Sequence, residues 1–323
     1  MLPSPSRDGP PRRPDLFVIG AMKSGTSFLS RQLGRHPSIF IPLLEEPSYF
    51  VPPDQLRQLW PYMWDQGIWR SEEAYLRLFL PGKDAAILAE ASTNYSKIPL
   101  ICGVPEQIAQ FNDAARFVYV MRDPVERTVS HYWHMVRFYA EHHTMRDAVR
   151  LNPQYLDVSN YAMQLAPYFA CFGPGRVFTL TFEELTRQTV ETMRRLYTWL
   201  GVDPTAALSA GSVEVENAAP DVVAMPGFLG GLLPLRNSRA LRAVIPHLPR
   251  TLRGAAKRLV TVEVERRFVD TSDVIAYLRP IQQRQTQALA AMLGREFPEW
   301  TTLYGDVAKS TPDTLPESCS ANV

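Results

Sequence analysis

The chain has 323 residues, of which 46% are hydrophobic and 21% charged, a composition typical of a globular protein with a sizeable core. Its 34 Lys and Arg residues nearly balance 33 Asp and Glu residues, and the net charge of +1 excludes bulk electrostatic attraction to nucleic acid or to an anionic membrane. Three widely spaced cysteines exclude a disulfide framework and a cysteine metal site, which fits a reducing compartment.

The two ends of the chain are predicted to lie outside the folded domain. Residues 1–15, MLPSPSRDGPPRRPD, are rich in proline and lack an apolar segment of signal-peptide length, so we expect a disordered leader. Residues 306–323 are polar and are expected to form a flexible tail, which leaves 16–305 as a single domain. Because no membrane-length apolar run occurs, we expect no membrane span and a cytoplasmic protein.

The stretch FVIGAMKSGTSFLSRQL, which begins at Phe17, predicts a strand, a short turn and a helix. Residues 16–19 form an apolar run of the length of a buried strand. From Thr26 onward apolar residues recur at helical spacing, and Thr26 or Ser27 is a suitable N-cap. The turn would expose backbone N–H groups at the positive end of the helix dipole, a geometry that binds phosphate-like anions. Lys23 would add a full positive charge there.

This loop differs from a Walker A loop, G-x-x-x-x-G-K-[ST], in which the lysine directly follows the second glycine. Here Lys23 comes before Gly25 instead. The loop therefore predicts phosphate binding without specifying a nucleoside triphosphate. An ordinary strand-to-helix turn with an exposed lysine is the alternative interpretation of this stretch taken by itself.

Short apolar runs alternate with helical patterns along the rest of the chain. The alternation predicts an α/β fold of the P-loop-like, three-layer kind, with about five mostly parallel strands flanked by helices. Residues 219–258, rich in proline, glycine and leucine, are interpreted as an insertion or lid of short helices. We expect further strands at 39–41, 86–89, 117–121 and 177–180, and helices at 54–63, 72–80, 105–111, 125–140, 188–200 and 272–297, the last broken at Pro280.

A second phosphate-binding pattern, RDPVERTVSHY, follows the strand predicted at 117–121. Pro124 suits the first turn of a helix, and Asp123 before it would be the N-cap. The Arg122 guanidinium can donate two hydrogen bonds to a phosphate, and the Ser130 hydroxyl, two turns into the helix, can donate a third. Two anion sites after two parallel strands imply a ligand with a phosphate at each end.

Together the two stretches resemble the cofactor signatures of sulfotransferases that use 3′-phosphoadenosine-5′-phosphosulfate (PAPS). GAMKSGTSFL is similar to the family's 5′-phosphosulfate loop, and YVMRDPVERTVSHY is similar to its 3′-phosphate strand, loop and helix. The resemblance implies that PAPS is the co-substrate, that no metal is required, and that Arg122 and Ser130 hold the 3′-phosphate. It also implies that the 5′-phosphosulfate is held by Lys23, Ser24, Gly25, Thr26 and Ser27.

The stretch EEPSYF, which begins at Glu45, is closest in style to the heparan sulfate type and bacterial carbohydrate-type sulfotransferases. In that branch a glutamate takes the proton from the acceptor, so the resemblance makes Glu46 the candidate base. The histidine base and carboxy-terminal motif of the cytosolic phenol and steroid branch do not appear in the sequence. Arg266 and Arg267 precede the last long helix, where related enzymes close a basic loop over the nucleotide.

Residues 88–99, LAEASTNYSKIP, match the family's next strand end only in part. Glu90 and Tyr95 agree with its pattern, whereas Ala91 stands where the family has a second catalytic lysine. Lys97 would replace that lysine only if the loop bends suitably.

The implied reaction is in-line transfer of a sulfuryl group to a hydroxyl or amine of a sugar, glycolipid or secondary metabolite. Lys23 would neutralise the leaving phosphate, and Glu46 would accept the proton. His131 and His134 share a helix face without a cysteine or carboxylate partner, so we interpret them as helix surface rather than metal ligands. A P-loop nucleotide kinase and a nucleotide-binding module without catalysis are the alternative functions. The identity of the acceptor and the oligomeric state stay open.

Overall fold

The computed structural model describes residues 12–139, 141–207, 222–226 and 261–305. The predicted leader, the predicted insertion or lid and the predicted tail lie largely outside these ranges. The described chain begins at Arg12, slightly before the predicted domain boundary. Arg12 Nη1 donates a hydrogen bond to the Ala85 carbonyl (2.6 Å), and the Asp15 N–H donates to the Leu88 carbonyl (2.8 Å), so this segment is tied to the domain.

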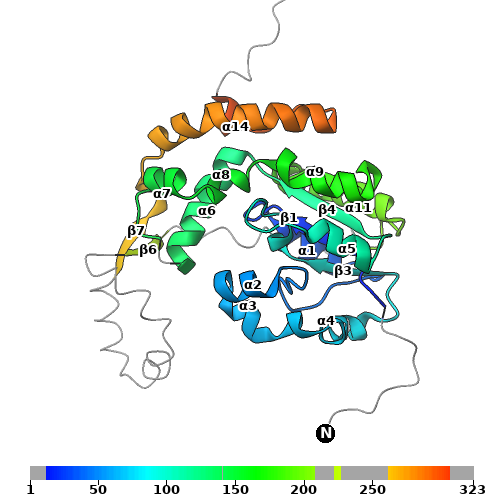
Figure 1. The fold of residues 1–323 in the computed structure, drawn as a ribbon. Coiled ribbons are helices and arrows are strands. Elements are labelled where there is room, and N and C mark those ends of the chain that lie inside the picture. Colours follow the sequence, from blue (N-terminus) through cyan, green and yellow to red (C-terminus); the bar gives the residue numbers. More distant parts are fainter. Residues whose placement is uncertain (1–11, 140, 208–221, 227–260, 306–323) are drawn as a thin grey trace, which may run out of the picture.

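The centre of the fold is a five-stranded, all-parallel sheet in the order β2-β3-β1-β4-β5 (Figure 1). This arrangement confirms the predicted fold class. In the register of the sheet, Phe17 of β1 lies between Glu90 of β3 and Phe117 of β4. Because the strands are parallel, the loops that follow them leave from one edge of the sheet. The strands are β1 Leu16–Gly20, β2 Ile39–Phe40, β3 Ile87–Ala91, β4 Arg116–Met121 and β5 Val177–Thr181.

Helices cover both faces of the sheet, because successive side chains of a buried strand point to opposite sides. Leu16 and Val18 of β1 belong to the core beneath α1, α10 and α11, whereas Phe17 and Ile19 belong to the core beneath α5, α9 and α14. The helices are α1 Thr26–Gly34, α2 Pro53–Leu59, α3 Pro61–Gln66, α4 Glu72–Leu76, α5 Val104–Phe111, α6 Pro124–Tyr139, α7 Met145–Leu151, α8 Gln154–Asp157, α9 Tyr161–Phe172, α10 Phe182–Arg187, α11 Thr189–Leu200, α14 Ser272–Leu293 and α15 Thr301–Tyr304.

Two predicted helix features are wrong. The N-cap of α1 is Gly25 rather than Thr26 or Ser27, because the chain turns there with φ at 89°, a left-handed value that glycine adopts without a Cβ penalty. Pro280 does not break α14, which runs from Ser272 to Leu293. Buried residues on both sides of the proline hold the helix against the core and outweigh its one missing hydrogen bond.

The segment 219–258 was expected to form short helices, but its described part is a strand. β6 Val222–Pro226 pairs antiparallel with β7 Thr261–Glu265, and Val222 lies opposite Glu265. The pair lies beside α6 (Figure 1), and β7 leads directly into a short 3₁₀ helix, η7 Arg266–Phe268. This pairing brings Arg266, distant in sequence, back to the rest of the fold.

Within the described ranges, no helix combines the length and the apolar character needed to cross a membrane.

Candidate active site

The loop between β1 and α1 has the conformation of an anion-binding turn. Gly25 adopts a φ of 89° at the N-cap of the nine-residue helix α1, and Lys23 has a φ of 69°, a value that non-glycine residues rarely adopt. Ser24 is fully buried, and its hydroxyl approaches the Tyr161 hydroxyl without a well-formed hydrogen bond. Thr26 is half-buried and Ser27 is exposed at the start of the helix. The loop therefore presents the amide end of a helix, and the Ser24 hydroxyl directly precedes it in the sequence.

Gly25 is fixed by its surroundings as well as by its φ. A Cβ added there would lie 2.7 Å from Cδ2 of the Phe182 ring. We expect Gly25→Ala to lower the free energy of unfolding by about 1–3 kcal/mol, from backbone strain and the displaced ring. Gly175→Ala is the matched control, because a Cβ at Gly175 meets nothing within 4 Å. Denaturant unfolding that places both variants equally close to the wild type would contradict this reading of the loop.

Lys23 lies in a group of positive charges. Burial lowers the pKa of Lys23, and Arg122, Arg266, Arg137 and Arg127 lower it further through charge repulsion. These arginines come from the end of β4, from α6 and from η7, so the structure collects them from distant parts of the sequence. A concentration of like charge of this kind favours binding of an anion, which would relieve the repulsion.

Arg122 is held in place at the end of β4. Its Nη2 and Nε atoms donate to Oε2 of Glu126, at 2.7 and 3.3 Å, and its guanidinium lies 4.9 Å from the centre of the Phe182 ring. Asp123 caps α6 as predicted: its Oδ1 accepts from the N–H groups of Val125 (3.0 Å) and Glu126 (3.4 Å). Asp123 therefore has a structural role rather than that of a Walker B acid.

Of the remaining residues proposed to hold the nucleotide, Ser130 and Arg266 have described side chains and Arg267 does not. Ser130 is half-buried in α6, two turns beyond Arg122. The Arg266 guanidinium lies 5.5 Å from the centre of the Trp133 ring on the same helix, and its charge acts on Lys23. The side chain of Arg267 lies outside the described part of the structure. Arg266 was assigned to the nucleotide only by resemblance to the family, and the fold brings its charge near the Lys23 loop.

Glu46 follows β2 on a loop with an unusual backbone. Glu46 and Ser48 have φ values of 51° and 52°, which are left-handed and uncommon for such residues. Oε1 of Glu46 accepts a hydrogen bond from Thr93 Oγ1 (2.8 Å). Burial raises the pKa of Glu46, while Lys97 and the bond from Thr93 lower it. Within the described chain, positive φ values outside glycine occur at Lys23, Glu46 and Ser48, all in the predicted site.

Lys97 and His134 are two further titratable groups whose charges interact with residues of the predicted site. The Lys97 side chain is buried, and burial lowers its pKa to about 8, against the influence of Glu46. Burial lowers the pKa of His134 to about 4, and the charges of Lys23 and Lys97 contribute to the shift. His134 therefore experiences the charges of both Lys23 and Lys97.

The prediction that both histidines of α6 are surface residues is wrong for His131. Its ring is buried against Tyr155, with a centroid distance of 4.7 Å, and lies within 3.4 Å of Arg127 Nη1. Burial and the charge of Arg127 lower the pKa of His131 well below its usual value, so it is a neutral core residue at neutral pH. His134 is half-buried instead.

Glu90 and Tyr95, which match the family pattern, are buried residues of β3 and of the loop after it. The Glu90 carboxylate accepts hydrogen bonds from the hydroxyls of Tyr75, Ser92 (2.7 Å) and Tyr95 (2.7 Å). These bonds compensate the cost of burying the carboxylate and fix the start of the loop that leads to Lys97.

Aromatic side chains surround Glu46. Trp60 is buried beneath Lys97, whereas Tyr62 of α3 and Tyr139 at the end of α6 are 56% and 42% exposed. Burial raises the pKa of both tyrosines, and the nearby charge of Glu46 raises it further. The two exposed rings therefore border the carboxylate from two different helices.

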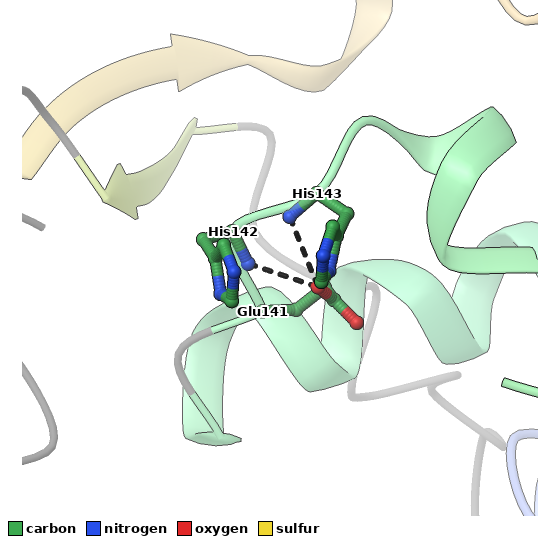
Figure 2. A group of neighbouring side chains, drawn as sticks. All are labelled: Glu141, His142 and His143. Carbon is green, nitrogen blue, oxygen red and sulfur yellow. Dashed lines mark hydrogen bonds and ion pairs between the residues drawn. The ribbon is translucent and has the colours of Figure 1, made fainter. Parts of the chain in front are cut away.

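Glu141, His142 and His143 form a group of potential metal ligands just beyond α6 (Figure 2). One ligand atom from each lies within 4.8 Å of the others. The Glu141 carboxylate, however, already accepts from the N–H groups of His142 (2.9 Å) and His143 (3.0 Å) and bonds to His143 Nδ1 (2.8 Å). These bonds stabilise the turn after the helix, which is a sufficient reason for the three side chains to converge.

Three residues near the site escaped the sequence prediction. His134 was interpreted as helix surface, and Arg137 and Arg127 were not singled out. Their positions on α6 relative to Arg122 follow from helical spacing, but the approach of the Lys23 loop to this helix depends on tertiary packing.

Comparisons with known proteins identify the family to which the chain belongs. Residues 14–206 match the sulfotransferase family, which covers β1 to β5 and both anion loops. A sulfotransferase from Alicyclobacillus acidocaldarius has a similar structure, with a TM-score of 0.59 and 25% identity over 90% of this chain and 99% of that one.

Two more distant structures show weaker similarity. The sulfotransferase domain from the curacin biosynthetic pathway is 17% identical, with a TM-score of 0.41 over 64% of this chain and 82% of that one. Mouse sulfotransferase SULT7A1 complexed with PAP is 18% identical, with a TM-score of 0.42 over 65% of this chain and 68% of that one. At these values they add no argument of their own. The match over residues 14–206 establishes that the chain belongs to the sulfotransferase family.

Proposed function

We propose that this protein transfers a sulfuryl group from PAPS to a hydroxyl or amine of its acceptor. The observation that carries the proposal is a helix N-terminus whose loop holds a cation-surrounded Lys23 in a left-handed conformation, together with a Glu46 carboxylate held by Thr93 at 2.8 Å on the loop after β2. A charged anion site beside a carboxylate base is what transfer between a bisphosphate and a neutral acceptor requires.

The cofactor would span the loops after β1 and β4. The 5′-phosphosulfate would bind the loop Lys23–Ser27, where the amide end of α1 is available and the buried Ser24 hydroxyl directly precedes it. The 3′-phosphate would bind Arg122 and Ser130, with Arg266 adding charge and Arg267 following it in sequence. Because β1 and β4 are neighbours, one ligand with two phosphates can reach both loops.

The chemistry would depend on position and charge rather than on covalent catalysis by the protein. The acceptor atom attacks sulfur, the bond between sulfur and the 5′-phosphate oxygen breaks, and 3′-phosphoadenosine-5′-phosphate (PAP) leaves. Lys23 neutralises the charge that grows on the leaving phosphate. Glu46 accepts the proton of the acceptor, and Thr93, which donates to one carboxylate oxygen, orients the group for this role.

The glutamate base favours the carbohydrate-type branch, in which the acceptor would be a sugar, a glycolipid or a related secondary metabolite. Tyr62 and Tyr139, both exposed and both influenced by the charge of Glu46, are suited to stack against a ring of the acceptor. The direct test incubates the protein with PAPS and a panel of oligosaccharides, glycolipids, amines and phenols, and measures PAP release and sulfated product by mass spectrometry.

Sulfation of a sugar hydroxyl or amine is the expected result. Phosphorylation of an acceptor from ATP would favour a kinase instead, and PAP binding without turnover across the panel would favour a binding module. Sulfation restricted to phenols would contradict the carbohydrate-type assignment alone.

Ser130 is expected to act on cofactor affinity rather than on turnover. Removing one hydrogen bond to a charged phosphate costs about 1.5 kcal/mol or more, so Ser130→Ala should raise the Kd for PAP by about tenfold and leave kcat nearly unchanged. Thr198→Ala is the control, because the Thr198 hydroxyl bonds within α11 on the exposed surface. Equal PAP affinities for Ser130→Ala and this control would remove Ser130 from the site.

A further inference from the structure

Hydrogen bonds join the loops after β2 and β3 around Glu46. The Ser48 N–H donates to Ser92 Oγ (3.0 Å), and Asn94 Nδ2 donates to Ser48 Oγ (3.0 Å). Thr93 Oγ1 donates to the Glu46 carboxylate itself (2.8 Å). The position of Glu46 therefore depends on the loop after β3, which contributes Ser92, Thr93 and Asn94 to these bonds.

Lys97 lies further along the loop after β3 and joins this network by a hydrogen bond to Asn94. Its side chain is 6% exposed, Nζ donates to Asn94 Oδ1 at 2.6 Å, and Nζ lies 4.6 Å from the centre of the Trp60 ring. An amide and an aromatic ring carry no net charge, so they compensate only part of the cost of burying an ammonium group. The carboxylate that acts on Lys97 is Glu46.

The two charges act on each other: Glu46 raises the pKa of Lys97, and Lys97 lowers the pKa of Glu46. Burial raises the pKa of Glu46, and among the groups that oppose burial Lys97 has the largest effect, ahead of the hydrogen bond from Thr93. A carboxylate that must accept a proton has to be ionised beforehand, so the group that opposes burial controls the fraction of active base.

Other described ionisable groups interact with Glu46 or Lys97, but none of those that interact with Glu46 supplies a positive charge. Those that act on or sense Glu46 are Glu45 on its own loop, Glu90 on β3, Tyr62 on α3 and Tyr139 on α6, and none of them is a cation. Those that face Lys97 from α6 are Arg127, His131 and His134. Both histidines are neutral at neutral pH, because burial lowers their pKa values.

We propose that Lys97 is a positioning residue for Glu46: its ammonium group is linked through Asn94 and Ser48 to the Glu46 loop, and from there its positive charge holds the carboxylate turned towards the acceptor. The inference rests on the proposed role of Glu46 as the base. It also accounts for Ala91, because the cation missing from the end of β3 is supplied by Lys97 at the end of the following loop.

The experiment reads Glu46 directly, by carbon-13 NMR of protein labelled at the glutamate side-chain carboxyl carbons. The Glu46 signal is assigned by its loss in Glu46→Gln and followed over pH in the wild type and in Lys97→Met. We expect the pKa of Glu46 to rise by about 1 unit in Lys97→Met, because an opposite charge nearby stabilises a carboxylate by at least this amount. Lys97→Arg, which keeps the charge, should stay close to the wild type. Lys83→Met at an exposed lysine is the matched control and should leave the signal unchanged.

A second readout uses water as the acceptor, so that no acceptor need be known. In PAPS hydrolysis, the water oxygen attacks sulfur, the bond from sulfur to the 5′-phosphate oxygen breaks, PAP leaves, and the water proton passes to Glu46. The acid limb of PAP release should move to higher pH in Lys97→Met. At one unit below the wild-type midpoint, the rate should fall by up to about tenfold, and the loss should shrink as the pH rises.

The outcomes separate this inference from the proposed function. An unchanged Glu46 titration in Lys97→Met overturns the role of Lys97, whatever happens to activity. Absence of PAPS turnover by the wild type would contradict the proposed function while leaving the NMR comparison valid. If Lys97→Met does not fold, Lys97→Gln retains a polar contact to Asn94 without the charge and must show the same rise. A rise of similar size in Lys97→Arg would also overturn the inference.

Discussion

Replacing Lys23 by alanine is expected to lower kcat for sulfuryl transfer by about 10²- to 10³-fold, the range found when one preorganised donor to a developing negative charge is removed. Lys23 is held in a left-handed conformation within the loop and is already surrounded by arginine charges. Its role is therefore to meet the charge that grows on the leaving phosphate, an interaction that strengthens in the transition state. Lys23→Arg, which keeps the charge but changes its shape and reach, should recover only part of the activity.

Steady-state PAP release from PAPS measures this effect, and Lys83→Ala is the control at an exposed lysine. Because Lys23 is repelled by its neighbours, Lys23→Ala should be at least as stable as the wild type, so the loss would not come from unfolding. A variant that retains more than half of the wild-type kcat would show that the leaving-group charge is neutralised elsewhere.

Glu46→Gln is expected to lower kcat by about 10²- to 10⁴-fold, the usual contribution of a general base. The glutamine carbonyl can still accept the hydrogen bond from Thr93, so the loop keeps its shape while the proton acceptor is lost. The KM for PAPS should change little, because Glu46 belongs to the acceptor side of the site rather than to the phosphate loops.

A pH profile separates this prediction from a packing effect. The wild-type kcat/KM should rise with pH through the pKa of Glu46, which burial places above its ordinary value, whereas Glu46→Gln should lack that limb. Glu191→Gln, which removes an exposed carboxylate from α11, is the control and should leave the profile nearly unchanged. Equal activity of Glu46→Gln and wild type would exclude Glu46 as the base.

The sheet could be predicted from the sequence because its strands are short, mainly apolar runs and most of their residues are buried. The run predicted at 117–121 is β4 Arg116–Met121, whose last five residues are buried, and the run at 177–180 is β5 Val177–Thr181. Helix boundaries were less accurate where proline intervenes. The helix predicted at 54–63 is two helices, α2 and α3, because the chain leaves the helical conformation at Trp60, directly before Pro61.

The phosphate loops could be placed because strand, turn and helix signals are local. The surroundings of Lys23 could not, because Arg266 reaches it only after β7 pairs with β6 and η7 packs against α6. The burial of Lys97 could not be predicted from the sequence either. Its burial on Trp60 depends on how the loops after β2 and β3 are bonded together, and no spacing in the sequence encodes that contact.

The left-handed residues of the site were equally invisible to sequence patterns. Glu46 and Ser48 hold φ values that cost free energy for residues with a Cβ, and the bonds from Thr93 and Asn94 to their side chains hold the loop in that form. Strain of this kind is maintained by tertiary contacts, so it appears only once the two loops are seen together.

The central claim is that a ligand with phosphates at both ends binds across the loops after β1 and β4. Calorimetric titration of the wild type and of Arg122→Ala with PAP, with ATP as the comparison ligand, tests it most directly. The claim predicts saturable one-to-one binding of PAP by the wild type, binding at least tenfold weaker in Arg122→Ala because a bidentate charged contact is lost, and little binding of ATP. Preference for ATP, or the absence of PAP binding by the wild type, would contradict it.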